Sequence, residues 1–439
     1  MFNLQFWYKL HRWISFICAV FLVILCLTGL PLIFKNEIHD LNLAHPQKIH
    51  EAIAYLDIWQ HVTDGEQTIL AKHPDKNIKA ISVQPQEGRM LYRVQDKNNH
   101  SVVNARMSMG GQQISYYPED SSMDMHHNSA VKSPFVSKFM HVMHVIHLRL
   151  GLGSGGMIFL GVMCFLSFLS VVTGLALYAP FMKKARFASI NKNTSMNKWL
   201  SWHNFCGVIT ACWAGILCFS GVMIVVFTLG YGHYIDSSKL AAKANLPATA
   251  DVADFTLPTA INYINQEFPD KYILSVDMPD NKTNNSQYVF YLTGAKEKPD
   301  EFIGQLVFVG KDANNNIQNY TEPLPLYLQF AAVMLNLHIH NHDNMLLKII
   351  WAIIDIITIV TIISGIMVWW RKSHNIIYQR SFKPGRMLNS WQIWQFPIYI
   401  AVLSLIGLIA PLSSSGIYIG FIAWILAFAL GIVQFIKAN

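Results

Sequence analysis

Residues 13–34 read WISFICAVFLVILCLTGLPLIF, an apolar stretch without a single charged residue. A helix rises about 1.5 Å per residue, so about 20 apolar residues cross the roughly 30 Å hydrocarbon layer of a bilayer. The stretch is therefore predicted to be a membrane-spanning helix. Lys9 and Arg12 precede it as in a signal peptide, but it is long for such a peptide and has no small-residue cleavage site, which indicates a retained helix.

The composition of the whole chain also indicates a membrane protein. Of the 439 residues, 52% are hydrophobic and only 13% are charged, whereas soluble domains carry about 25% charged residues. Five more apolar stretches are long enough to span a bilayer, and Pro411 with serines 413–415 predicts a tight hairpin between the last two. All six cysteines lie in apolar stretches and are expected to be small buried residues rather than disulfides or metal ligands.

The distribution of charge predicts the orientation of the chain. Residues 181–198 and 371–390 each carry five Lys or Arg residues and no acidic residue, so both segments and both termini are expected in the cytoplasm, with the polar segments in the periplasm of a bacterium. We predict a first span (1–34), an outer domain (35–140), a second span (141–180), a cytoplasmic loop (181–202), a third span (203–229), a second outer domain (230–336), a fourth span (337–370), a second cytoplasmic loop (371–390) and a final helix pair (391–439).

Each outer segment is predicted to form a small α+β domain. Alternating apolar and polar residues indicate strands, and helical patterns precede them near 47–60 and 257–267. The predicted strands are 79–84 and 91–94 in the first segment and 288–292 and 305–309 in the second.

The chain repeats its plan of helix, outer domain and helix, and the repeat singles out four histidines. Each histidine precedes a Ser/Thr-Gly pair by a fixed offset: 18 residues from His11 to Gly29 and from His203 to Gly221, and 27 residues from His147 to Gly174 and from His338 to Gly365. Two matching offsets are difficult to obtain by chance. The glycines are expected to let helices pack closely.

The depth of these histidines indicates two pairs. His11 and His203 begin spans that start inside, and we call them the inner pair. His147 and His338 begin spans that start outside, and we call them the outer pair. An imidazole near the apolar part of a bundle is costly unless it finds a partner, and haem iron accepts two axial nitrogens in a gap between apolar helices. We therefore predict a four-helix bundle that holds two haem b groups in series. The sequence contains no Cys-x-x-Cys-His motif, so covalent attachment of the haem is not expected.

Neighbouring histidines leave alternatives for the outer ligands. His144 lies one helical turn before His147, and His340 lies two residues after His338, so each is an alternative ligand. The shared offset of 27 residues favours His147 and His338.

Other polar residues have predicted roles near the haems. Arg12 and Arg149 adjoin two of the ligands and are expected to pair with haem propionates. Several histidines on the outer side could form an approach surface for a substrate or metal, although a His-rich polar loop without such a role is the favoured interpretation for the stretch 121–129. These histidines are His144, His340, His342, His126 and His127.

At these motifs the chain resembles the PepSY-associated transmembrane family, which includes inner-membrane ferric-siderophore reductases. The resemblance covers about residues 1–375. It implies a four-helix core with two haem b groups, two periplasmic PepSY-like domains, and reduction of iron held by a siderophore. The motifs that carry it are Leu10-His11-Arg12, Thr173-Gly174-Leu175-Ala176-Leu177, Leu337-His338 and Ser364-Gly365-Ile366-Met367-Val368-Trp369-Trp370-Arg371.

The expected activity is that of an oxidoreductase, a transmembrane ferric-chelate reductase. The loops are too short for a flavin or nicotinamide domain, and no phosphate-binding motif is present, so the electron donor is a cytosolic reductase or membrane quinol. Membrane lipid surrounds the spans, and no nucleic-acid partner is expected. Two alternatives are a metal transporter, which needs more acidic residues than Asp355 inside the spans, and a PepSY-domain regulator without haem.

Overall fold

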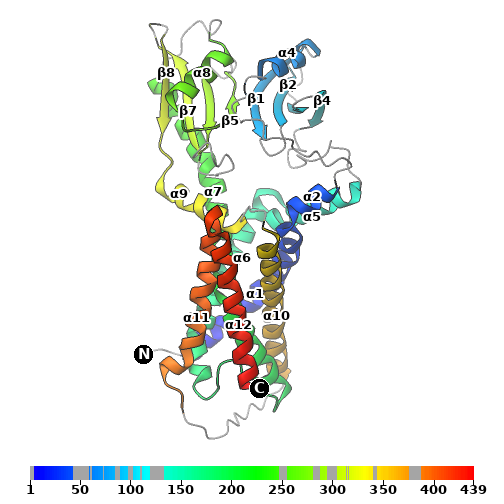
Figure 1. Cartoon of the computed structure of the whole chain (residues 1–439), viewed down its shortest axis with the longest axis vertical. Coiled ribbons are helices and arrows are strands. Elements are labelled where there is room, and N and C mark those ends of the chain that lie inside the picture. The colour runs from blue at the N-terminus through cyan, green and yellow to red at the C-terminus, as the bar shows by residue number, and fades with distance from the viewer. Residues whose placement is uncertain are drawn as a thin grey trace. The chain divides into compact units, whose positions relative to one another are not determined.

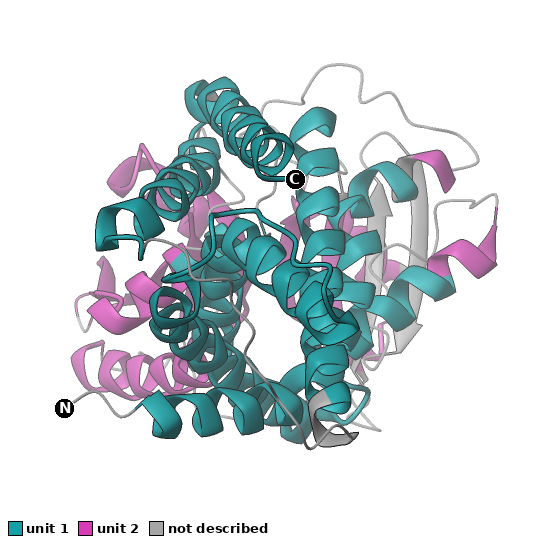
Figure 2. Cartoon of the chain, turned by 90° about the horizontal axis from the view of Figure 1, so that it is seen from below, with its two compact units in different colours: residues 1–38, 138–226, 334–439 teal, residues 39–137, 227–333 magenta. Residues whose placement is uncertain are grey.

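The computed structural model describes residues 4–42, 59, 62–72, 74–84, 89–96, 102–108, 111–118, 133–246, 255–279, 287–293, 304–312, 314, 316–339, 344–374 and 387–439. The chain divides into two compact units, each assembled from separate parts of the sequence (Figure 2). Unit 1 contains residues 1–38, 138–226 and 334–439, and unit 2 contains residues 39–137 and 227–333.

Unit 1 is helical, and Figure 1 shows its long helices running side by side. Within the described residues, six helices are long and apolar enough to cross a membrane, which confirms the predicted number of spans. Their apolar residues recur on all sides, as expected for helices that face both lipid and neighbouring helices. The six are α1 (Leu4–Ile33), α6 (Gly153–Met182), α7 (Ser195–Asn245), α10 (Met345–His374), α11 (Ser390–Ile409) and α12 (Ile417–Ala438).

Two shorter helices carry the outer pair of histidines. His147 lies near the end of α5 (Pro134–Arg149), and His338 lies near the end of α9 (Leu326–Ile339). The sequence predicts a single helix over 141–180, but the structure divides it, because Leu150 has a φ of 51° and Gly151 a φ of 73°. These left-handed conformations end a helix, and glycine adopts them without steric cost. His147 therefore precedes the span rather than beginning it.

The final helix pair packs as a hairpin, as predicted. Two short 3₁₀ turns, Ala410–Leu412 and Ser414–Gly416, connect α11 to α12. Gly407 on α11 allows the close approach of α12, since a Cβ atom at this position would lie 2.5 Å from Nε1 of Trp424. Trp424 is in turn buried against Trp213 of α7, so the hairpin is packed against the rest of unit 1.

Unit 2 contains an antiparallel sheet of eight strands in the order β4-β3-β2-β1-β5-β6-β7-β8. The helices α2 (Lys35–Asn42), α4 (Val62–Lys72) and α8 (Leu257–Glu267) accompany it, although α2 begins in unit 1. The strands are β1 (Lys76–Gln84), β2 (Arg89–Asp96), β3 (Val102–Ser108), β4 (Gly111–Pro118), β5 (Ile273–Asp277), β6 (Tyr288–Leu292), β7 (Gln305–Lys311) and β8 (Ile317–Glu322).

The two outer segments join through their strands. Each contributes four strands, and β1 of the first pairs antiparallel with β5 of the second, with Ile81 opposite Val276. Both of these side chains are fully buried in one hydrophobic core. The sequence predicts the strands in β1, β2, β6 and β7 and the helix α8. The helix predicted near 47–60 lies outside the described residues, apart from Trp59.

Candidate functional site

The structure brings the four repeat-matched histidines together as two pairs in unit 1. The ring centroids of His11 on α1 and His203 on α7 are 6.4 Å apart, with 57° between the ring planes. Those of His147 on α5 and His338 on α9 are 6.3 Å apart, at 55°. Each pair takes one residue from each half of the sequence repeat. The two pairs therefore have nearly the same geometry although they lie on different helices.

The spacing within each pair matches that of two imidazoles on one metal ion. A bond between a metal and an imidazole nitrogen is about 2 Å long, so two such bonds with half a ring at each end span about 6 Å. A direct hydrogen bond between two rings would bring them closer than this by about 1 Å. The pairs thus leave room for one ion between the rings.

In the outer pair, the Nδ1 atom of each ring is held by a hydroxyl group on another helix. Nδ1 of His147 lies 3.1 Å from Oγ1 of Thr28 and 3.1 Å from the carbonyl oxygen of Leu25. Nδ1 of His338 lies 2.9 Å from Oγ of Ser220. Thr28 and Ser220 are the residues of the Ser/Thr-Gly pairs in α1 and α7.

In the inner pair, Nδ1 of each ring likewise lies close to a hydroxyl and a carbonyl oxygen of another helix. Nδ1 of His11 lies 3.1 Å from Oγ1 of Thr173 and 3.0 Å from the carbonyl oxygen of Ser170 on α6. Nδ1 of His203 lies 2.9 Å from the carbonyl oxygen of Thr361 and 3.4 Å from Oγ of Ser364 on α10. All four Ser/Thr-Gly pairs therefore contact a histidine ring.

These contacts determine which ring nitrogen carries the proton. A carbonyl oxygen can only accept a hydrogen bond, so Nδ1 must donate where it meets Leu25, Ser170 or Thr361. Each of the four hydroxyls donates its own hydrogen to a carbonyl of its own helix, and so can accept one from Nδ1. The lone pair of each ring is then on Nε2, the tautomer in which a histidine binds a metal through Nε2.

In three of the four Ser/Thr-Gly pairs, the glycine allows a histidine ring to approach the helix closely, whereas at Gly221 a Cβ atom would meet Cys164 instead. A Cβ atom at Gly174 would lie 3.1 Å from Cε1 of His11, and one at Gly365 would lie 3.1 Å from Cε1 of His203. At Gly29 the corresponding distance to His147 is 3.2 Å. The sequence predicts that these glycines let helices pack closely, and the structure adds that three of them receive a histidine ring.

The repeat in the sequence becomes a symmetry in space. Thr173 and His11 are 162 residues apart, and the equivalent Ser364 and His203 are 161 apart. Thr28 and His147 are 119 residues apart, and Ser220 and His338 are 118 apart. In each half, the first span (α1 or α7) contacts the second histidine of that half (His147 or His338). The second span (α6 or α10) contacts the first histidine (His11 or His203).

The two pairs lie in separate layers of the bundle. Seventeen residues separate His11 from Thr28 along α1, and seventeen separate His203 from Ser220 along α7. At about 1.5 Å per residue, this places the layers about 25 Å apart, which is close to the thickness of the hydrocarbon layer.

Buried polar atoms without partners occur in residues that follow His11 on α1 and the Ser364-Gly365 pair on α10. Among the described residues, Nε of Arg12, Nε of Arg371 and Nε1 of Trp369 are buried without a hydrogen-bond partner. The guanidinium carbon of Arg12 lies 5.9 Å from the centroid of the Trp369 ring. A buried donor of this kind costs stability unless a ligand satisfies it. The sequence predicts a role for Arg12 but not for Trp369 or Arg371, which only their place after the fourth Ser/Thr-Gly pair could have indicated.

The other residues predicted for the site are not part of the two histidine pairs. His144 lies one turn before His147 on α5, and it is His147 that faces His338. Arg149 is the last residue of α5. His126, His127, His340 and His342 lie outside the described residues.

The other metal-binding side chains in the described part of the chain do not form a cluster. No group of three or more His, Cys, Asp or Glu side chains gathers there. The six cysteines are free thiols, as expected from their apolar surroundings. The histidine pairs are therefore the candidate metal centres.

The family of the chain is indicated by its sequence. A family model described as the PepSY-associated TM region matches residues 8–372, a range that includes all four histidines and all four Ser/Thr-Gly pairs. None of the curated proteins matches the chain. The helices α11 and α12 lie entirely beyond the matched range.

Proposed function

The chain belongs to the PepSY-associated transmembrane family, and we propose that it is a membrane protein that transfers electrons through two b-type haems. The observation that carries this proposal is the geometry of the two histidine pairs. The spacing of the ring centroids in each pair suits two imidazoles on one iron ion, and hydrogen bonds at Nδ1 orient the rings and leave Nε2 free to bind it.

The chemistry of the surrounding residues fits haem. When bound, haem supplies an iron that gains and loses one electron reversibly. His11 and His203 would hold one group, and His147 and His338 the other. The donors of Arg12, Arg371 and Trp369 would meet the propionates of the inner haem, where charge-assisted hydrogen bonds are strong.

The direction of transfer follows from the predicted orientation. The inner pair lies toward the basic segment 183–198 and would receive electrons from a cytosolic reductase or from quinol. The outer pair would deliver them to an acceptor on the periplasmic side of the inner membrane. We propose a ferric siderophore or another ferric chelate as the acceptor, because hard oxygen ligands hold ferrous iron less tightly than ferric iron.

The first experiment is the absorption spectrum of the purified full-length protein. We expect a reducible b-type spectrum and two haems per chain by pyridine haemochrome assay. His147→Ala or His338→Ala should leave one haem, and His11→Ala or His203→Ala should leave the other. A folded, colourless protein would contradict the proposal and would favour a PepSY-domain regulator or a metal transporter.

His144→Ala is the matched control, because this histidine lies one turn from a proposed ligand on the same helix. It should retain both haems. The acceptor is tested separately by adding ferric chelates to the reduced protein and following reoxidation of the haem spectrum. Failure of every ferric chelate to oxidise it would remove the reductase activity but not the haem proposal.

A further inference from the structure

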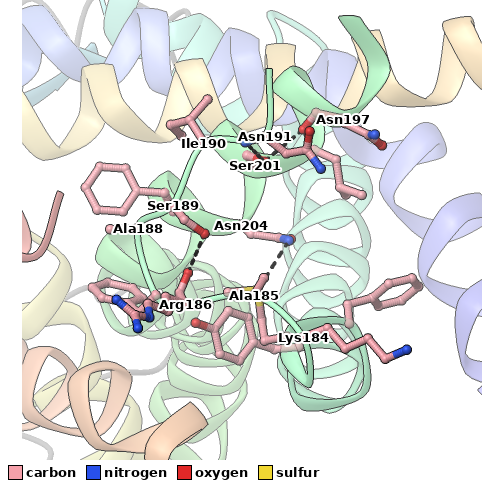
Figure 3. A pocket seen from close by; sticks show the side chains of 16 residues that line it. Lys184, Ala185, Arg186, Ala188, Ser189, Ile190, Asn191, Asn197, Ser201 and Asn204 are labelled. Carbon is pink, nitrogen blue, oxygen red and sulfur yellow. Dashed lines mark hydrogen bonds between the residues drawn. The ribbon is translucent and has the colours of Figure 1, made fainter. Parts of the chain in front are cut away.

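A cavity lies at the basic end of unit 1, and neither the predicted haem sites nor the family match assigns it a role. Its walls are the end of α6, the segment 184–191 and the first turns of α7 (Figure 3). Its volume is about 260 Å³, smaller than the roughly 300–1,000 Å³ of pockets for drug-sized ligands. A one- or two-ring headgroup fits this space, whereas a flavin nucleotide is too large.

The final helix pair forms hydrogen bonds with the segment that lines one side of this cavity. The side chain of Asn439, after α12, accepts a hydrogen bond from the backbone N–H of Ile190 at 2.8 Å and donates one to the carbonyl of Ala188 at 2.8 Å. The N–H of Leu388, before α11, donates to the carbonyl of Lys183 at 3.0 Å. Figure 3 shows Ala188 and Ile190 on the wall of the cavity. The helices α11 and α12 thus contribute to the shape of the site.

The hydroxyl of Tyr178 is the polar group that suggests a ligand. Its side chain lines the cavity and is only 6% exposed, and its hydroxyl has no hydrogen-bond partner among the described residues. Its ring packs against Trp394 of α11, with 5.3 Å between centroids. A buried hydroxyl without a partner is unfavourable, and a ligand oxygen that reached it from the cavity would satisfy it.

The remaining walls select the class of ligand. Four aromatic rings, those of Tyr178, Phe181, Phe187 and Phe205, line the cavity, which suits a flat ring. Asn204 offers an amide whose described partner is a weak contact with Sδ of Met182 at 3.9 Å. Among the described residues that line the cavity, the charged ones are the basic Lys184 and Arg186. Their positive charge disfavours a cationic ligand.

The cavity lies beside the inner pair, because Asn204 is the residue after His203 in α7. We propose that this cavity binds the headgroup of an isoprenoid quinol and that Tyr178 and Asn204 form hydrogen bonds with the quinol oxygens. The proposal deepens the proposed function, on which it rests, by naming the electron donor. Oxidation of one quinol to the quinone would release two O–H protons to water and two electrons, and two haems held by the histidine pairs would each accept one electron.

The test measures binding first, independently of electron transfer. A short-chain naphthoquinone is titrated into the full-length protein in detergent, and its binding is followed by quenching of tryptophan fluorescence, to which Trp394 beside Tyr178 contributes. Tyr178→Phe and Asn204→Leu should each weaken binding at least tenfold and leave the haem spectrum unchanged. Tyr399→Phe is the matched control, since Tyr399 is 45% exposed on α11, and it should bind as the parent does.

The outcomes separate this proposal from the function it rests on. Equal binding by the parent and Tyr178→Phe, or displacement of the quinone by anionic phospholipid, would overturn the quinol site. Reduction of the haems by quinol that is lost in Tyr178→Phe but retained with dithionite would support it. Quinone binding that depends on Tyr178 in a protein without haem would support the site while contradicting the electron-transfer function.

Discussion

Oγ1 of Thr28 lies 3.1 Å from Nδ1 of His147, although 119 residues separate them in the sequence. The same relationship joins Ser220 to His338 in the other half of the chain. A histidine that binds a metal is oriented by the partner of its second nitrogen, and loss of such a partner lowers metal affinity about 10- to 100-fold. The hydroxyls of the Ser/Thr-Gly pairs are therefore expected to control how tightly haem is held.

Removal of these hydroxyls should affect the two haems unequally. Ser220→Ala removes an acceptor 2.9 Å from Nδ1 of His338, whereas Ser364→Ala removes one at 3.4 Å from His203, whose Nδ1 keeps the carbonyl of Thr361 at 2.9 Å. We expect Ser220→Ala to accelerate loss of the outer haem about tenfold or more and Ser364→Ala to have a smaller effect on the inner haem. Transfer of haem to an excess of an acceptor protein measures both rates.

The matched control for these variants is Ser404→Ala on α11. Ser404 is fully buried, and its hydroxyl lacks a hydrogen-bond partner among the described residues, so it takes no part in the described histidine contacts. Rates of haem loss that are the same for Ser220→Ala and Ser404→Ala would contradict the role given to the hydroxyls.

Addition of one methyl group beside a histidine should displace it. In Gly174→Ala the new Cβ atom would lie 3.1 Å from Cε1 of His11, which forces the ring to shift. We expect this variant to lose most of its inner haem and to retain about one haem per chain. Gly215→Ala is the control, since its Cβ would meet Val171 at an ordinary 3.7 Å and alanine favours a helix over glycine by about 1 kcal/mol. Equal haem content in the two variants would contradict the prediction.

A buried ion pair is expected to stabilise unit 1. Nζ of Lys348 on α10 lies 2.6 Å from Oε1 of Glu37 on α2, and the two side chains are 5% and 22% exposed. Lys348→Met should lower the free energy of unfolding by about 3 kcal/mol or more, because it leaves a largely buried carboxylate without its cation. Thermal unfolding in detergent measures the change. The double variant with Glu37→Gln should recover much of the loss, and failure to recover would show that Lys348 acts through packing instead.

The stability of unit 2 should depend on pH through Asp277. Burial raises the pKa of this carboxyl above its ordinary value, although Lys239, a hydrogen bond from Tyr291 and Arg93 oppose the shift. The folded state therefore favours the protonated form. The stabilisation is complete below the unfolded-state pKa of about 3.9 and is lost as the pH rises through the higher folded-state value. Asp277→Asn should remove this loss, so that the variant becomes more stable relative to the parent as the pH rises above the unfolded-state pKa.

An oppositely shifted carboxyl provides the control for Asp277. Asp312 is partly exposed, and hydrogen bonds from the backbone N–H groups of Asn316 and Asn314 lower its pKa. The stability of Asp312→Asn should therefore fall relative to that of the parent as the pH rises. Unfolding temperatures at several pH values test both directions, and the same trend in the two variants would refute the assignment.

The sequence predicts the spans and the histidine pairs well, because both depend on patterns along the chain. Six apolar stretches correspond to six helices, and equal offsets from His11 and His203 to their glycines correspond to equal geometry in the structure. The break at Leu150 was not predicted, although the residues 150–156 read LGLGSGG and such a run of glycines favours the end of a helix.

The strands were predicted only in part. The apolar strands β6 and β7 are evident from their patterns, whereas β8, with the sequence IQNYTE, is mostly polar and lies at the edge of the sheet. The pairing of β1 with β5 joins segments that are almost 200 residues apart, and register between such strands depends on burial of Ile81 and Val276 rather than on any local preference.

By itself, the sequence determined that this is a protein of six apolar spans with four histidines at matched positions, because hydrophobic length and repeat offsets are properties of the chain alone. Only the tertiary structure decided that each Ser/Thr-Gly pair serves the histidine of a different helix, that Nδ1 of every ring carries the proton, and that Tyr178 is buried beside a cavity. The physical reason is that hydrogen bonds and cavities arise between helices, and which faces meet depends on the packing of the whole bundle.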